Sequence, residues 1–380
     1  MAAVASRGVV SRAHKPPQAA LMDFAISRRP GPLLATALLL TIGALAVVPA
    51  LADKPAETLT APIATTVSAI PINFDRDRPQ RKTFGKLTFL GGLNLFAKSR
   101  FFGGYSGIAL DPSGTALLAI SDAGTWMRAT LDYDGRYLKA MRGVTLGPIL
   151  GKDGTPLRDD AERDSEGLAL TSGDTRAGIA FVSFERDHRI LRYPFTKDRF
   201  GPPDRAVSLP KEARAMTANS GIEAVALIRA GRLKGTLVAF AERLIDRSGN
   251  LRGWMIGGPS PGPITLRRLG GYDITDAAGL PDGGLIVLER RFRFSEGVKM
   301  RIRRISPGEL KPGTLIEGEV LLEAEDNLNI DNMEAITVHR SRGGETVLTL
   351  MSDDNFSPLQ RTLIMQFAMP EGRPLAAGTR

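Results

Sequence analysis

The chain has 380 residues, with 50 Lys and Arg against 41 Asp and Glu, three His and no Cys. The lack of Cys excludes disulfides, thiolate zinc sites and cysteine nucleophiles, and three His are too few for a His-rich metal site. The formal net charge is +9, but the basic residues are scattered among acids, so we expect no nucleic-acid binding.

The first 52 residues have the pattern of a secretory leader. Arg28 and Arg29 precede an uncharged run over residues 32–48, and the small-residue sequence Ala-Leu-Ala then ends at Ala52. We therefore predict a signal peptide over residues 1–52, cleaved after Ala52, and a periplasmic or secreted protein without a stable membrane span. The alternative is an inner-membrane anchor formed by an uncleaved leader, because the apolar run is close to the length of a span.

Within the leader, Met22 is a possible true translation start, because a leader that begins there has an ordinary length.

The rest of the chain divides into three parts. Residues 53–82 are rich in Pro, Thr and Asp and are predicted to be a flexible lead-in. Residues 83–370 are predicted to form the folded domain, residues 371–380 a tail, and the whole protein a monomer.

The predicted domain repeats itself with a period of about 55–60 residues, which is typical of propeller blades. Each unit opens with a small or acidic residue and a short apolar strand, at 106–110, 166–170, 223–227, 276–280 and 334–338. A tight turn and a second apolar strand that ends in charged residues follow, at 118–122, 181–186, 237–243, 285–290 and 347–354. Strand, turn and strand at this spacing predict an all-β propeller.

The two ends of the domain are predicted to close the ring. Residues 86–95 precede the first unit and residues 362–367 follow the last, and both have the pattern of strands. Because open sheet edges expose unpaired backbone groups, we expect these strands to pair in a shared sixth blade. A seven-bladed propeller is the alternative, and a two-domain β-sandwich is less favoured. Helices are expected only within residues 161–165 and 245–254.

Acidic residues recur at two positions of the repeat. The first acidic column, at the start of the first strand, contains Glu166, Glu223, Asp276 and Glu334. The second acidic column, at the end of the second strand, contains Asp122, Glu185, Glu242, Glu289 and Asp353. In an antiparallel hairpin the start of one strand lies beside the end of the next, so both columns are expected at one mouth of the central channel.

A ring of carboxylates needs compensating positive charge, because like charges at close range repel. Arg186, Arg243 and Arg290 each follow an acid of the second column and could supply it. A hard cation is the other candidate, and Ca²⁺ prefers oxygen ligands. The expected ligands are Glu185, Glu242, Glu289, Glu334, Asp276 and Asp353. Alternatively, these acids bind backbone amides and hold one blade to the next.

Two weaker signals lie elsewhere. Residues 327–331 alternate oxygen-bearing side chains, run into Glu334 and are a candidate Ca²⁺-binding loop. They lack the glycine of an EF-hand loop, and a plain acidic turn is the alternative. His188 is a candidate general base or simply a polar loop residue. No G-x-S-x-G, P-loop or H-E-x-x-H motif is present.

Four short motifs resemble a known family. They are Asp164-Ser-Glu-Gly-Leu168, Ser-Phe-Glu-Arg186, Gly221-Ile-Glu-Ala224 and Asn332-Met-Glu-Ala335. Together they resemble the bacterial domain called "esterase-like activity of phytase", or phytase-like, over roughly residues 83–370. The resemblance implies a propeller similar to the propeller phytases and a phosphoesterase activity. The matching positions are Glu166, Glu185, Arg186, Glu223, Glu242, Arg243, Glu289, Arg290 and Glu334; the first unit departs from the pattern at Ser106.

Three functions follow as hypotheses. The leading one is a periplasmic phosphoester hydrolase in which carboxylates hold a divalent cation, Glu166 and Glu223 take part in catalysis, and three arginines, Arg186, Arg243 and Arg290, neutralise developing charge. The second is a non-catalytic propeller that binds a ligand or partner of the cell envelope. The third is a Ca²⁺-dependent lactonase or carboxylesterase propeller.

Overall fold

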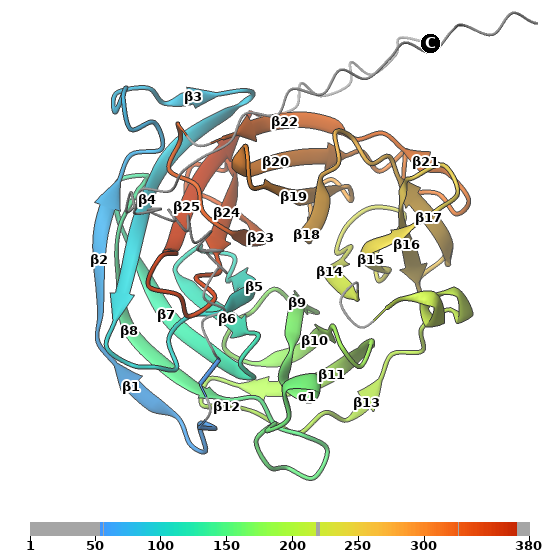
Figure 1. The fold of residues 1–380 in the computed structure, drawn as a ribbon, viewed down its shortest axis with the longest axis horizontal. Helices are drawn as coiled ribbons and strands as arrows, with labels where there is room; N and C mark the ends of the chain where they lie inside the picture. The colour runs from blue at the N-terminus through green and yellow to red at the C-terminus, as the bar shows by residue number, and fades with distance from the viewer. Residues whose placement is uncertain (1–53, 56, 218–220, 326, 371–380) are drawn as a thin grey trace, which may run out of the picture. The chain divides into compact units, whose positions relative to one another are not determined.

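The computed structural model describes residues 54–55, 57–217, 221–325 and 327–370. These residues form an all-β propeller of five sheets around a central axis (Figure 1). The predicted leader and tail lie outside the described residues. Within the described ranges, no helix is long and apolar enough to cross a membrane.

The first two blades follow each other along the chain. In each, the innermost strand comes first and the next strands pair antiparallel, moving outward. The first blade contains β5 (Tyr105–Leu110), β6 (Ala116–Ser121), β7 (Thr125–Asp134), β8 (Tyr137–Pro148) and an outer β1 (Ile63–Thr65). The second contains β9 (Ser165–Leu170), β10 (Gly178–Phe184), β11 (Arg189–Thr196), β12 (Arg199–Phe200) and β13 (Arg205–Ala206).

The third and fourth blades repeat this order. The third contains β14 (Ile222–Leu227), β15 (Leu237–Ile245), β16 (Leu251–Ile256), β17 (Gly262–Leu266) and β21 (Leu315–Ile316), which pairs parallel to β17. The fourth contains β18 (Asp273–Gly279), β19 (Leu285–Arg293), β20 (Gly297–Ile305) and β22 (Glu319–Ala324).

The fifth blade joins the two ends of the domain. It contains β23 (Met333–Arg340), β24 (Thr346–Ser352), β25 (Thr362–Met369), β4 (Leu87–Ala97), β2 (Val67–Ile72) and β3 (Thr83–Phe84). The last strand, β25, lies between β24 and β4, with Thr362 opposite Leu95 and Phe367 opposite Phe89. The predicted pairing of the terminal strands is therefore confirmed.

The expected number of six blades is wrong, because the terminal strands complete the fifth blade instead of building a sixth. β23 and β24 accept β25, β4 and β2 as their outer strands. Each innermost strand contacts the next around the ring, and β23 contacts β5. Five inner strands thus close the ring, and the five repeated openings correspond to the five blades.

A five-membered ring brings the inner strands close together, and glycine makes this approach possible. A Cβ atom on Gly107 would lie 2.9 Å from the backbone oxygen of Glu166, and one on Gly167 would lie 2.8 Å from that of Glu223. Any side chain at these positions would push neighbouring blades apart. The small residues of the repeated openings therefore reflect the narrow centre of the ring.

Two further expectations need correction. The predicted flexible lead-in contains two strands, β1 and β2. They pair with β8 and β4 and so cover the outer edges of two blades.

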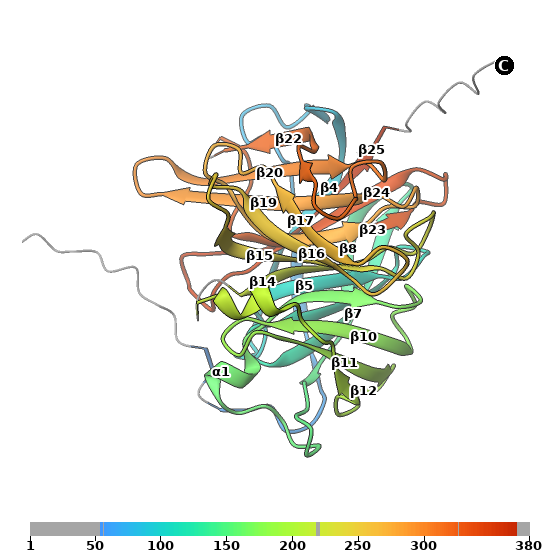
Figure 2. The same cartoon turned by 90° about the vertical axis from the view of Figure 1, so that its right-hand side faces the viewer.

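The described helical segments are α1 (Asp160–Arg163) and the 3₁₀ helix η1 (Lys211–Ala215). Residues 245–254 form the end of β15, a turn and the start of β16 instead of a helix. Figure 2 shows α1 projecting from one face of the ring.

Candidate functional site

One end of the central axis opens into a cavity of about 740 Å³, which we call the mouth. It lies where the inner strands begin and the second strands end. Its described carboxylates are Asp122, Asp160, Asp164, Glu166, Glu185, Glu223, Glu242, Glu334 and Asp353. Its described cations are Lys54, Arg158, Arg163, Arg186 and Arg290, so the mouth is acidic within a basic protein.

Backbone irregularities turn the first acidic column into the mouth. In β14 the pairing with β15 skips Glu223, and in β23 the pairing with β24 skips Glu334, so each glutamate sits in a bulge. The pairing of β9 with β10 shifts in the same way beside Glu166. A bulge re-aims a side chain that would otherwise follow the strand's alternation. The three glutamates consequently share one cavity.

The second acidic column reaches the same cavity from the neighbouring strand ends. The backbone N–H groups of Glu185, Glu242 and Asp353 each donate to the carbonyl that precedes the inner strand, at 2.9 to 3.0 Å. Asp122 makes the same bond to Gly104 at 2.9 Å. Both acidic columns therefore meet at one mouth in the second, third and fifth blades, and the first blade contributes Asp122 of the second column.

The fourth blade differs by one residue. Here the bulge falls on Thr275, and Asp273 lies opposite Arg290. Arg290 therefore occupies the ring position that Glu242 occupies in the third blade. A shift of one residue places a side chain on the other face of a strand. Asp276 and Glu289, the acids next to Thr275 and Arg290, therefore lie outside the mouth.

Asp276 and Glu289 consequently do not join the other predicted ligands. Asp276 is buried and accepts hydrogen bonds from the backbone N–H groups of Ala277 (2.7 Å) and Ile336 (2.8 Å). Glu289 is fully buried and forms a two-pronged ion pair with Arg303, at 2.8 and 2.5 Å. Asp276 thus binds backbone amides and joins the fourth blade to the fifth, as the alternative interpretation of the repeated acids proposed, whereas Glu289 pairs with an arginine side chain of its own blade.

The three predicted arginines take different places. Arg290 lines the mouth and contacts Glu334 Oε1 at 3.1 Å. Arg186 lines it too, and its Nε donates to Asp164 at 2.9 Å. Arg243 is not among the described lining residues: it is half exposed and pairs with Glu242 and with Asp273 of the next blade, both at 3.1 Å.

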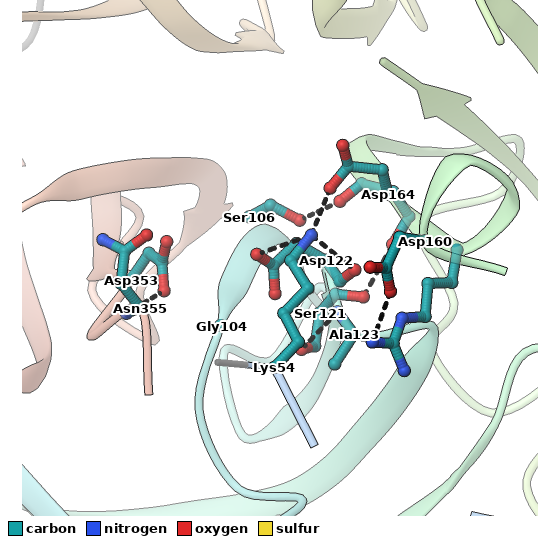
Figure 3. A network of polar contacts seen from close by, with 12 residues as sticks. Lys54, Gly104, Ser106, Ser121, Asp122, Ala123, Asp160, Asp164, Asp353 and Asn355 are labelled. Carbon is teal, nitrogen blue, oxygen red and sulfur yellow. Dashed lines mark hydrogen bonds and ion pairs between the residues drawn. The ribbon is translucent and has the colours of Figure 1, made fainter. Parts of the chain in front are cut away.

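Lys54 brings an unexpected cation into the mouth from far away in the sequence. Its Nζ lies 3.2 Å from Asp122 Oδ2, donates to the Asp122 carbonyl at 3.1 Å and pairs with Asp164 (Figure 3). Burial alone would lower the pKa of Lys54, but Asp122 and Asp164 raise it. The ammonium group therefore stays charged and neutralises part of the acidic ring.

Two groups of carboxylates converge closely enough to share one cation. They are Asp164–Glu166–Glu185 and Glu185–Glu223–Glu242, and in each group one oxygen per residue lies within 4.8 Å of the others. Ca²⁺ binds oxygens at about 2.3–2.6 Å, so ligands on opposite sides of one ion are about 5 Å apart. The described carboxylates therefore fit a hard cation, and Glu185 belongs to both groups.

The crowding shifts the proton equilibria of the mouth. Burial, with nearby carboxylates, raises the pKa of Glu166 and Glu223 well above the ordinary value. Burial raises the pKa of Glu242 and Glu334 to about 7, although Arg243 and Arg290 respectively oppose the shift. Asp122 Oδ1 is buried with no hydrogen-bond partner among the described residues. The ring thus holds protons near neutral pH unless another cation replaces them.

The weaker signals lie outside the mouth. His188 lines a separate surface pocket beside η1. Asn329 and Asp331 accept hydrogen bonds from Arg361 at 3.2 and 3.0 Å, and Asn329 also donates to the Asn73 carbonyl. These contacts support the interpretation of residues 327–331 as an acidic turn.

Asp164 and Lys54 are the main mouth residues that the repeat pattern does not indicate. Asp164 immediately precedes the second inner strand. The corresponding positions in the first, third and fifth blades are Gly104, Gly221 and Asn332, and only the fourth blade also has an acid there, Asp273 opposite Arg290. The position of Arg290 was open to prediction, because it stands as far after Leu285 as Glu242 stands after Leu237.

The chain resembles known proteins in overall structure and in sequence profile. The chain is similar to an endo-arabinase from Bacteroides thetaiotaomicron VPI-5482 with 15% identity, covering 72% of this chain and 96% of that one, with a TM-score of 0.43. It is also similar to the protein in "Structure of U3-55K", with 11% identity, 75% and 77% coverage and a TM-score of 0.33. No curated protein matches the sequence. The profile of the phytase-like family, described as "Esterase-like activity of phytase", matches residues 100–356, more than half of the chain, and the protein therefore belongs to this family.

Proposed function

We propose that this protein is a hydrolase that uses a divalent cation bound in the mouth, with phosphoesters as the leading substrate class. Membership of the phytase-like family supports a hydrolase-type propeller. The observation that carries the proposal is the convergence of Glu185, Glu223 and Glu242, with Asp164 and Glu166 beside them. All are oxygen donors, which favours Ca²⁺ over softer metals.

The charge of the mouth explains why such an enzyme would need the cation. Nine described carboxylates face five described cations there. A phosphoester approaching this cavity alone would be repelled by the ionised carboxylates. A bound divalent cation would offset part of this negative charge, polarise the substrate and lower the pKa of a bound water.

The surrounding residues have distinct roles in this proposal. Glu185, Glu223 and Glu242 hold the cation. Glu166 has a strongly raised pKa and keeps a proton that it can pass to a leaving-group oxygen. Arg290, held by Glu334 at 3.1 Å, orients its guanidinium toward the mouth and binds an anionic oxygen of the substrate. Arg186 offers a second such contact.

The test combines metal binding with turnover. The protein is titrated with Ca²⁺ by calorimetry after chelation, and a panel of phosphomonoesters, phosphodiesters, carboxylic esters and lactones is assayed with and without EDTA. We expect Glu242→Gln to lose Ca²⁺ binding and activity together. Glu319→Gln, which removes an exposed carboxylate on β22, is the matched control. Undiminished turnover in EDTA would remove the cation from the mechanism.

A non-catalytic binding propeller is the second candidate. Among the described residues of the mouth there is no His, and the hydroxyl of Ser106 donates to the Ser165 carbonyl at 2.5 Å instead of meeting a base. This arrangement offers no activated side-chain nucleophile. Ca²⁺ binding without turnover of any compound in the panel would favour this candidate. Turnover of carboxylic esters or lactones alone would favour the third hypothesis.

We also propose that the protein acts in the periplasm or outside the cell, on the pattern of residues 1–52. Fusion of residues 1–60 to a reporter that is active only after export tests this. Mass spectrometry of the exported protein should find Asp53 as the first residue. A full-length, membrane-bound product would support the anchor instead.

A further inference from the structure

The turn between β19 and β20 carries two exposed aromatic side chains. Phe294 is 94% exposed and Phe292 is 62% exposed. β19 ends at Arg293, which pairs with Gly297 at the start of β20, so both phenylalanines lie at the tip of the hairpin. Single exposed apolar residues are common on protein surfaces, but two large rings at one tip are typical of a site that contacts another apolar medium.

The hairpin stands on the side of the ring on which the mouth opens. β19 is the second strand of the fourth blade, and the mouth residue Arg290 lies three residues before its end. Figure 2 shows the hairpin extending well beyond the inner strands, on the same side as α1. The tip can therefore reach a flat surface ahead of the inner strands.

The two neighbouring blades add exposed apolar side chains on the same side. The inner strand of the fourth blade, β18, contacts β14 of the third and β23 of the fifth. In the third blade, Ile245 ends β15 three residues after the mouth residue Glu242 and is 47% exposed. In the fifth, Leu359 is 83% exposed in the connection from β24 to β25, which begins with the mouth residue Asp353. The exposed apolar side chains are thus separate projections from three adjacent blades.

Basic residues flank the phenylalanines. Arg291 and Arg293 both pair with Glu296, and Lys299 lies 3.2 Å from the same carboxylate. Lys299 also pairs with Glu325, at 2.7 Å. Three cations therefore share two carboxylates at this hairpin, and Arg293 keeps more than half of its side chain exposed.

The charge of the whole molecule is distributed in the same sense. Residues 1–52 contain five Lys and Arg and one Asp, and the mouth contains five described cations and nine described carboxylates. Outside these two sets, 40 Lys and Arg stand against 31 Asp and Glu, a net charge of +9. An excess of this sign attracts the molecule to an anionic surface, whereas the acids that oppose the attraction are gathered around the central axis.

We propose that the third, fourth and fifth blades dock on the surface of an anionic membrane, with Phe292 and Phe294 inserted between the lipid headgroups. Phenylalanine and arginine suit this depth, because the ring enters the apolar boundary while the guanidinium binds lipid phosphates. Ile245 and Leu359 enter the same boundary from the neighbouring blades.

The separation of the apolar tips favours lipid over a protein partner. A stable protein interface needs a contiguous, complementary surface of about 800 Å² on each side. A fluid lipid surface closes around each tip by itself and needs no such continuity. Docking in this way turns the mouth toward the membrane, and the inference does not depend on the activity of the mouth.

Vesicle sedimentation tests the proposal. The protein used begins at Asp53, because the apolar leader would itself bind lipid, and the ring is complete without it since the first strand, β1, begins at Ile63. EDTA is present throughout, so that no divalent cation bridges the mouth to lipid phosphates. We expect binding to phosphatidylcholine vesicles that contain about one third phosphatidylglycerol to be about tenfold tighter than binding to pure phosphatidylcholine vesicles.

Variants at exposed positions identify the contact. The double substitution Phe292→Ser and Phe294→Ser should weaken binding to the anionic vesicles about tenfold, because the two rings no longer leave water. Arg293→Gln should weaken it about fivefold. Tyr137→Ser, which removes an exposed aromatic ring at the other end of the first blade, is the matched control and should bind as the wild type does.

Three results would overturn the proposal: no binding of the wild type to the anionic vesicles, equal affinity for the two kinds of vesicle, or unchanged binding of the double variant. Sedimentation velocity without lipid adds a fourth. A wild-type dimer that the double variant separates into monomers, without vesicle binding by either, would assign the apolar tips to a second copy of the chain.

Discussion

Glu242→Gln tests whether the buried carboxylates of the mouth hold protons. Most substitutions of a buried residue destabilise a fold, but this one should stabilise it at high pH. The pKa of Glu242 is raised from 4.5 to about 7, chiefly by burial. The folded state therefore holds this proton more tightly than the unfolded state. The resulting stability is fully present below pH 4.5 and is lost as the pH rises through about 7.

The magnitude follows from the shift. At 1.36 kcal/mol per pKa unit, the shift of Glu242 corresponds to about 3 kcal/mol lost between pH 4.5 and pH 8. Glutamine cannot ionise and avoids this loss. It gives up the contact with Arg243 at 3.1 Å, but Arg243 is half exposed and the contact contributes at most about 1 kcal/mol. We expect Glu242→Gln to be about 2 kcal/mol more stable than wild type at pH 8 without metal.

Urea unfolding in EDTA at pH 5 and pH 8 measures this difference. The variant should show a weaker pH dependence than the wild type, and Ca²⁺ should stabilise only the wild type at pH 8. Glu319→Gln serves as the control and should behave as the wild type under both conditions. A Glu242→Gln protein that is less stable than wild type at pH 8 in EDTA would refute the reasoning, because the carboxylate would then be stabilising when ionised.

Three further predictions concern other parts of the molecule. Glu289→Gln should destabilise the fold by about 3–5 kcal/mol in urea unfolding, because it leaves Arg303 buried without its charged partner; unchanged stability would show that the pair is not needed. Lys54→Met should tighten Ca²⁺ binding about tenfold in calorimetry by removing a positive charge from the mouth; weaker binding would mean that Lys54 organises the site. Deletion of residues 361–380 removes β25 and should abolish cooperative unfolding, since it separates β24 from β4. A soluble, cooperatively folding truncated protein would contradict the observed closure.

Much of the fold follows from local patterns. The five openings, the turns and the charged strand ends are short-range features that repeat along the chain, so they predict hairpins of a propeller without knowledge of distant contacts. The pairing of residues 362–367 with residues 86–95 was also predictable, because an open ring would expose two sheet edges. The number of blades was not, since the pattern does not say which edge the terminal strands join.

The candidate site was predictable to the level of its columns but not of each residue. Glu185, Glu223 and Glu242 converge as their repeat positions indicate. In the fourth blade a one-residue difference in register places Arg290 in the mouth and buries Glu289 against Arg303. Glu289 and Arg290 are adjacent and both charged, so residue type alone could not show which of them faces the mouth. The distance from the start of the second strand could, because Arg290 stands as far after Leu285 as Glu242 after Leu237.

The sequence by itself therefore determined the blade, the closing strands and the acidic character of two repeat positions, because these depend on neighbours along the chain. Only the tertiary structure decided what surrounds each charge. Lys54 reaches Asp122 and Asp164 across long stretches of chain, and Arg136 of the first blade pairs with Glu345 of the fifth. Such contacts depend on how the blades pack around the ring, and no local pattern encodes that packing.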